Sequence, residues 1–151
     1  MRCAIGADDA GPLTDALLAD LERRGIDAER FGLLRPLSSS EGQDGAEDIE
    51  WASIGRAVGA AVAAGRADFG IVCCWTGTGI SIAANKVRGV RAALCADATT
   101  AQGARRWNDA NVLALSLRAP SAAVGLEILD AFLATEASAD SADRRSIAAV
   151  E

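Results

Sequence analysis

The sequence of 151 residues contains no histidine. This absence excludes catalysis by a cysteine–histidine pair, and because there is also no C-x-x-C pair we expect no metal site. Basic residues are in deficit as well, with 15 Lys and Arg against 21 Asp and Glu and a net charge of −6. Neutralising phosphates needs a basic face, so nucleic acid and an anionic membrane surface are not expected as partners.

Long apolar runs are missing too. No segment reaches the roughly 20 apolar residues that a membrane span needs, and the opening MRCAIGADD lacks the apolar centre of a signal peptide. We therefore expect a cytoplasmic protein. Most of the cysteines stand within or at the end of apolar runs, which predicts buried thiols rather than disulfides. The four cysteines are Cys3, Cys73, Cys74 and Cys95.

Aromatic residues are scarce, at 4%, although 50% of the residues are hydrophobic. The core should therefore consist of small side chains, with helices packed closely on a sheet. Strands are expected at residues 2–6, 28–31, 69–74, 90–94 and 111–115. Helices are expected at residues 12–24, 49–64, 80–86, 98–107 and 121–135. This alternation, in a length that suits one domain, predicts an α/β protein: a three-layer α/β/α Rossmann-like domain with a mainly parallel central sheet.

We expect this single domain to span residues 1–135. Within it, residues 35–47 (RPLSSSEGQDGAE) are polar and rich in serine and glycine, which predicts a surface loop. The tail, residues 136–151, is polar and carries one Arg-Arg pair. We interpret it as a candidate for a short helix that packs on a neighbouring subunit.

The most informative stretch is CCWTGTGISIAANK, residues 73–86. A strand, a Thr-Gly-Thr-Gly turn and a helix follow one another, so several backbone N–H groups should surround a small concavity. Such a nest favours an anion, either a phosphate or a developing enolate oxygen, although the same pattern also makes ordinary tight turns. A Walker motif is excluded because no Gly-Lys-Ser/Thr follows, and the third glycine of a dinucleotide fingerprint is missing.

Cys74 is the best candidate for a reactive group here, because it ends the expected strand and adjoins the turn. A thiol at a helix N-terminus gains thiolate character and can act as a nucleophile or a general base. Ligands of α/β proteins bind at the carboxyl ends of the strands, so we expect Cys74, Asp8, Asp9 and Asn108 to gather at that edge. The other cysteines are interpreted as small buried residues.

Further polar residues carry two interpretations each. Asp8 and Asp9 end the first strand and could position hydroxyls or transfer protons, while one of the two is expected to cap the following helix. In the segment WNDAN, Asn108, Asp109 and Asn111 could bond ligand oxygens. They could equally cap the helix and hold the turn before the next strand.

Two stretches together, GIVCCWTGTGISIAANKVRGVRAALC and ARRWNDANVLAL, resemble the ribose-5-phosphate isomerase B family, which also holds the galactose-6-phosphate isomerase subunits. The opening ADDAG fits as well, and the likeness covers about residues 1–135. It implies a Rossmann-like domain in a homodimer or tetramer with sites shared between subunits. It also implies interconversion of an aldose phosphate and a ketose phosphate, in which a base moves a proton between C1 and C2 through a cis-enediolate without a metal or organic cofactor.

The resemblance implies roles for individual residues as well. Cys74 matches the catalytic base, Asp8 an aspartate that contacts the sugar, and Asn108 an asparagine that steadies the enediolate. The turn that holds the substrate comprises Thr76, Gly77, Thr78, Gly79 and Ser81. The arginines that match the phosphate region are Arg118, Arg144 and Arg145. From the residues alone, each arginine could equally be a solvated surface charge.

Some positions depart from the family pattern. The family has histidine where this chain has Asp9 and Trp107, and glycine where it has Trp75. The histidine at the position of Trp107 opens the furanose ring of a pentose phosphate. A tetrose 4-phosphate cannot close into that ring, because its 4-oxygen carries the phosphate, and Trp75 and Trp107 would shrink the pocket. We therefore favour a tetrose 4-phosphate, such as erythrulose 4-phosphate, as substrate.

Other functions fit the same residues. A carboxylate at Asp9 would repel a phosphate at a cost on the order of 1 kcal/mol or more, so the substrate could be an unphosphorylated keto-sugar. An epimerase with the same enediolate chemistry is a second alternative. A sugar-binding or partner subunit without catalysis is a third, which the loss of both family histidines favours and which the retention of Cys74, the turn and Asn108 opposes.

Overall fold

The computed structural model describes residues 1–36 and 49–150. Its sheet has five strands in the order β2-β1-β3-β5-β4, and every pairing is parallel. The strands are β1 (Arg2–Ala7), β2 (Asp27–Gly32), β3 (Phe69–Cys74), β4 (Ala92–Leu94) and β5 (Val112–Ser116). The parallel sheet of the predicted α/β fold is thus confirmed.

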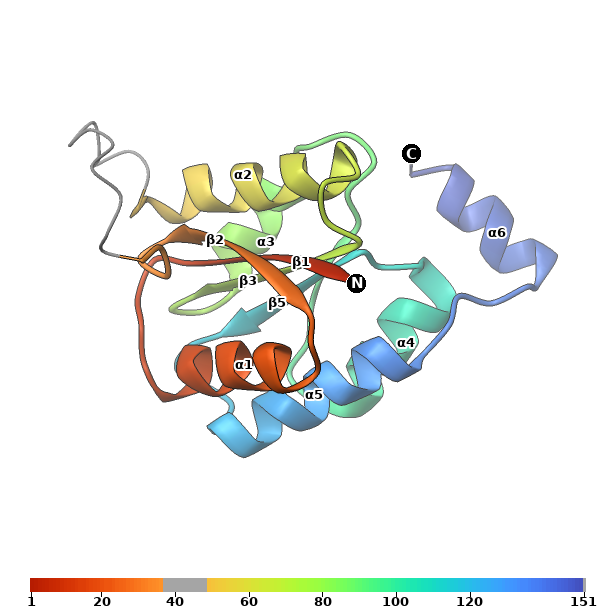
Figure 1. Ribbon diagram of the computed structural model, residues 1–151. Coiled ribbons are helices and arrows are strands. Elements are labelled where there is room, and N and C mark those ends of the chain that lie inside the picture. The colour runs from red at the N-terminus through yellow and green to blue at the C-terminus, as the bar shows by residue number, and fades with distance from the viewer. Residues whose placement is uncertain (37–48, 151) are drawn as a thin grey trace.

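Helices cover both faces of this sheet (Figure 1). One face carries α1 (Pro12–Arg23), α4 (Ala98–Asn108) and α5 (Ala122–Ala134), and the other carries α2 (Trp51–Ala63) and α3 (Thr78–Ala84). A last helix, α6 (Ser141–Ala148), lies beside α4 and buries none of its residues. Among residues 1–36 and 49–150, no helix combines the length and the apolar character that crossing a membrane requires.

Side chains alternate between the two faces along the fully buried strand β3. Ile71 and Cys73 belong to the core under α1 and α5, whereas Val72 and Cys74 belong to the core under α2 and α3. This is the period of two that a strand imposes. The two adjacent cysteines therefore occupy different layers of the protein, and all four cysteines are buried free thiols, as predicted.

Three elements begin two residues away from their predicted start. The helix α3 begins at Thr78 rather than near residue 80, so the second Thr-Gly of the turn is helical, and α2 begins at Trp51 rather than at residue 49. The strand expected from residue 90 begins only at Ala92, because the N–H of Arg91 donates to the side-chain oxygen of Asn111 at 2.8 Å. Most of the loop predicted at 35–47 lies outside the described residues.

The carboxyl ends of β1, β3 and β5 meet at one edge of the sheet. Ala7 pairs with Cys73 across β1 and β3, and Cys74 pairs with Ser116 across β3 and β5. The segments that follow these strands therefore start side by side. Asp8 follows β1, the glycine turn follows β3, and Arg118 follows β5.

Candidate active site

The turn after β3 is built around Gly77. Its φ of +74° is left-handed, and a Cβ atom there would lie 2.5 Å from Leu94 Cδ1 and 2.9 Å from the carbonyl oxygen of Leu115. Only glycine fits both the conformation and the space. The Gly77 N–H donates to the carbonyl of Cys74 at 3.1 Å, and its own carbonyl accepts from the N–H of Ser81 at 3.2 Å. The turn therefore leads directly from the strand into α3.

The end of β5 holds this turn in place. The Ser116 hydroxyl donates to the carbonyl of Trp75 at 2.9 Å, and the N–H of Leu117 donates to the carbonyl of Cys74 at 3.0 Å. The guanidinium of Arg118 lies 5.7 Å from the centre of the Trp75 ring, a cation–π contact. Thr76, Ser116 and Arg118 line one hollow of about 430 Å³. Trp75 is 63% exposed and holds Arg118 beside the turn.

The two adjacent cysteines differ in their surroundings. Cys73 is completely buried, and burial, reinforced by the nearby Cys74 and Asp8, raises the pKa of its thiol to about 12. At neutral pH Cys73 is therefore a neutral thiol. Cys74 is 5% exposed, ends its strand and adjoins the turn. Of the two, Cys74 is the thiol that stands at the edge where the polar groups converge.

The carboxylates after β1 lie at the same edge. Partial burial raises the pKa of Asp8, and the neighbouring charges of Asp9 and Glu50 raise it further. Asp9 is exposed and accepts the N–H of Ala10 at 2.8 Å. The prediction that one of the pair caps the next helix is wrong, because Gly11 is the N-cap of α1 and Thr14 bonds to both its N–H and its carbonyl.

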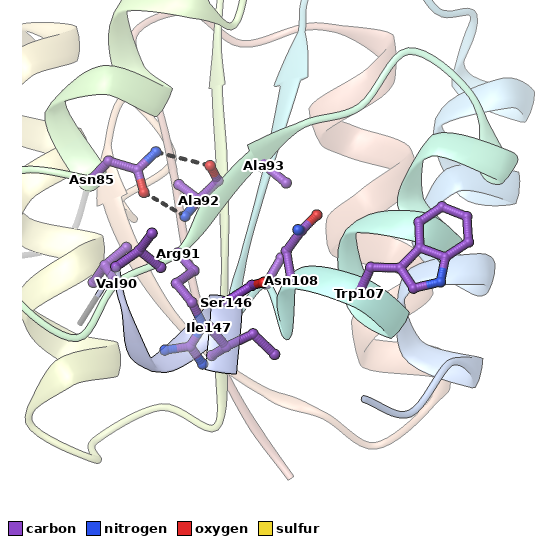
Figure 2. Close-up of a pocket in the computed structure, with 11 residues that line it drawn as sticks. Asn85, Val90, Arg91, Ala92, Ala93, Trp107, Asn108, Ser146 and Ile147 are labelled. Atoms are coloured by element: carbon purple, nitrogen blue, oxygen red, sulfur yellow. Dashed lines mark hydrogen bonds between the residues drawn. The ribbon is translucent and has the colours of Figure 1, made fainter. Parts of the chain in front are cut away.

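Asn108 does not lie with Cys74 in the same chain, contrary to the prediction. The helix α4 follows β4, runs back along the sheet and ends at Asn108. The chain then enters β5 at its amino end, where the carbonyl of Asn111 accepts from the N–H of Gly70 near the start of β3, at 2.9 Å. Asn108 instead lines a hollow of about 420 Å³ together with Asn85, residues of β4 and residues of α6 (Figure 2).

Trp107 stands on the same part of α4. Its ring covers Gly103, where a Cβ atom would lie 2.8 Å from Trp107 Cζ3, and Figure 2 shows it pointing away from Asn108. Arg144 and Arg145 lie on α6, where Arg145 donates to the hydroxyl of Ser141 at 3.2 Å. Within one chain, these four predicted site residues are therefore separate from the group at the carboxyl edge.

The remaining polar residues of WNDAN, Asp109 and Asn111, form hydrogen bonds that join the end of α4 to the segment before β4. Asp109 adopts a left-handed φ of 45°, and its carboxylate accepts from Arg105 at 2.9 Å and from Arg91 at 3.1 Å. The side chain of Asn111 accepts from the N–H of Arg91 and donates to the carbonyl of Gly89, each at 2.8 Å. Of the two interpretations of these residues, the structural one is confirmed.

We expect Asp109→Ala to lower the free energy of unfolding by about 2 kcal/mol, because it leaves two partly buried guanidinium groups without their carboxylate and places alanine in a left-handed conformation. Urea unfolding followed by circular dichroism would measure the change. Asp109→Asn should lose less, since asparagine tolerates this conformation. Glu127→Ala, on the exposed side of α5, is the control. Equal values for Asp109→Ala and Glu127→Ala would contradict the structural role.

Comparison with known proteins places the chain in a family. A family model described as Ribose/Galactose Isomerase matches residues 3–150. The chain belongs to this family. Ribose-5-phosphate isomerase B of Escherichia coli (strain K12) is 35% identical over 136 residues, which are 89% of this chain and 85% of that protein. The resemblance stated from the sequence is confirmed.

A second relative and a solved structure extend the comparison. The D-erythrulose-4-phosphate isomerase of Pectobacterium atrosepticum is 34% identical over 137 residues, which are 90% of this chain and 84% of that protein. The solved structure of ribose-5-phosphate isomerase B from Clostridium thermocellum superposes with a TM-score of 0.84 at 36% identity, covering 99% of this chain and 95% of the other. The Rossmann-like α/β fold is thereby confirmed.

Sequence reasoning missed two residues at the carboxyl edge. Glu50 stands close enough to raise the pKa of Asp8, and the ring of Trp51 contacts Gly79 in the first turn of α3. The signal was present in the sequence, because Trp51, Gly55 and Gly59 recur every four residues on one side of a helix. Such a pattern predicts close contact with a neighbouring helix, but it does not identify which helix that is.

Proposed function

We propose that this protein is an aldose–ketose isomerase of a small sugar phosphate, with Cys74 as the base. The observation that carries the proposal is the position of Cys74, at the end of β3 and directly before the Gly77 turn, in a chain of the Ribose/Galactose Isomerase family. The turn and the end of β5 are joined by hydrogen bonds, so the groups beside Cys74 are preorganised.

The reaction proceeds in three proton transfers. Cys74, as the thiolate, takes a proton from C1 of the ketose; the C–H electron pair becomes the C1–C2 double bond, and the carbonyl electrons move to O2. Donors of the turn after β3 stabilise this enediolate. One proton passes from O1 to O2, the Cys74 thiol returns its proton to C2, and C1 becomes the aldehyde carbon. Atoms and electrons balance within the substrate and the thiol.

The favoured substrate is a tetrose 4-phosphate. The chain has no histidine to open a furanose ring, and a tetrose 4-phosphate needs no such step. The D-erythrulose-4-phosphate isomerase of Pectobacterium atrosepticum is among its relatives at 34% identity. Both observations support the shorter substrate.

A second copy of the chain completes the site in this proposal. Asn108, Arg144 and Arg145 lie away from Cys74 within one chain, on the end of α4 and on α6. The family resemblance implies sites shared between subunits, so these residues would reach Cys74 of a neighbouring subunit. The cationic side chains would bind the phosphate, and Asn108 would donate to the enediolate.

One observation favours an unphosphorylated substrate instead. Asp9 and Glu50 stand close enough to Asp8 for their charges to raise its pKa at the carboxyl edge, and in the same chain Arg118 is the cation that follows β5. Carboxylates repel a phosphate dianion. If no second copy supplied its arginines, this edge would suit a neutral keto-sugar better than a phosphate.

The proposal is tested by product analysis. D-erythrulose 4-phosphate, D-ribulose 5-phosphate and D-erythrulose would each be incubated with the purified protein, and the products separated and identified by NMR. We expect D-erythrulose 4-phosphate to yield the aldose tetrose 4-phosphate. An epimeric ketose as the product would instead indicate an epimerase, and turnover of D-erythrulose alone would favour the unphosphorylated substrate.

A further inference from the structure

Trp51 presents a large apolar surface at the carboxyl edge of the sheet. It is the first residue of α2 and remains 42% exposed. Its ring contacts the second glycine of the turn, because a Cβ atom at Gly79 would lie 3.0 Å from Trp51 Cε3 and 3.2 Å from Cδ2. The indole thus stands directly beside the residues that follow Cys74.

The position of this indole is fixed by the contact between α2 and α3. Trp51, Gly55 and Gly59 lie on one side of α2, four residues apart. A Cβ atom at Gly55 would lie 2.7 Å from the carbonyl oxygen of Ile80, and one at Gly59 would lie 3.1 Å from Val87 Cγ2. The helix α2 therefore approaches α3 and the residues that follow it too closely for larger side chains at positions 55 and 59.

The N-terminus of α2 also stands beside the end of β1. Glu50, the N-cap of α2, lies close enough to Asp8 for its charge to disfavour ionisation of that carboxyl. The start of α2 therefore stands beside both the carboxylate after β1, through Glu50, and the turn after β3, through Trp51. Trp75, the residue after Cys74, contacts Arg118.

We propose that Trp51 is a substrate-binding residue, whose indole forms an apolar wall against the C–H groups of the sugar phosphate while the turn binds its oxygens. This inference rests on the proposed isomerase function and identifies a part of that site which the catalytic residues do not supply. One part of the ring covers Gly79, and another part remains exposed. The exposed part of the ring is what a bound carbon chain would cover.

Steady-state kinetics of three variants tests whether Trp51 binds the substrate. In Trp51→Ala we expect KM for D-erythrulose 4-phosphate to rise about ten-fold, with kcat changed much less, because packing on the substrate is lost while the proton-transfer groups stay. Trp51→Phe should recover most of the affinity. The control, Ile82→Ala, removes another exposed apolar side chain, on α3, and should leave KM unchanged. Equal KM values in Trp51→Ala and Ile82→Ala would overturn the proposal.

An NMR titration keeps this test separate from the test of the isomerase function. The chain has three tryptophans, so the indole N–H region holds few signals, and Trp51→Phe assigns one of them. Adding D-erythrulose 4-phosphate to the wild type should shift the Trp51 signal. A shift without any turnover would support substrate binding by Trp51 while contradicting the isomerase function. If the Trp51 signal stays unmoved while the substrate turns over or other signals shift, only the proposed role of Trp51 is overturned. A titration in which no signal shifts would overturn that role as well.

Discussion

Replacing Cys74 with serine lowers the rate of isomerisation by about 1,000-fold in our expectation, because a serine hydroxyl at this position is a far weaker base than a thiolate and general base catalysis contributes about 100- to 10,000-fold. The effect should appear in kcat, since the substitution changes one atom and leaves the Gly77 turn intact. The measurement is the steady-state rate with D-erythrulose 4-phosphate, with circular dichroism to show that the variant is folded.

The adjacent cysteine provides a matched control. Cys73 is fully buried in the layer under α1 and α5, and its thiol is neutral at pH 7 because burial raises its pKa to about 12. Cys73→Ala should therefore cost about 1 kcal/mol of stability from the lost sulfur while keeping the activity. A loss of activity in Cys73→Ala as large as in Cys74→Ser would contradict the assignment of Cys74 as the base.

The second large effect concerns the substrate. We expect kcat/KM for D-erythrulose 4-phosphate to exceed that for D-ribose 5-phosphate by about 100-fold, the lower part of the range for a lost acid–base group. The physical reason is that the chain has no histidine at the position of Trp107 to open the ring of a closed pentose phosphate. Coupled assays with each substrate at several concentrations would give the ratio.

The comparison within the pentoses sharpens this prediction. D-ribulose 5-phosphate cannot close into a furanose through its phosphorylated 5-oxygen, so it should be a better substrate than D-ribose 5-phosphate if ring opening is the missing step. Similar values for D-ribose 5-phosphate and D-erythrulose 4-phosphate would show that the absence of histidine has no bearing on the substrate.

Much of the fold could be predicted from the sequence because its signals are local. The apolar run of β3 predicts a strand buried on both faces, and the Ser121 hydroxyl bonds to the N–H of Val124 at the start of α5, as the expected cap. The boundaries that were missed depend on side chains from elsewhere. The strand β4 is short because Asn111 binds the backbone of Arg91.

The candidate site could be predicted only in part, because its members come from different elements. Cys74 and Gly77 were visible as one motif along the chain. The prediction for Asn108 is wrong because α4 runs back from the carboxyl edge, so that its last residue lies near the start of β5. Trp51 was missed because its contact with Gly79 exists only once α2 and α3 are packed together.

The most direct test of the central claim is hydrogen exchange at C1 of D-erythrulose 4-phosphate in deuterium oxide, followed by proton NMR. With the wild-type protein we predict that one C1 proton is replaced by deuterium, and that the exchange is lost in Cys74→Ser and kept in Cys73→Ala. No exchange at C1, or exchange that persists undiminished in Cys74→Ser, would contradict an enediolate mechanism with Cys74 as its base.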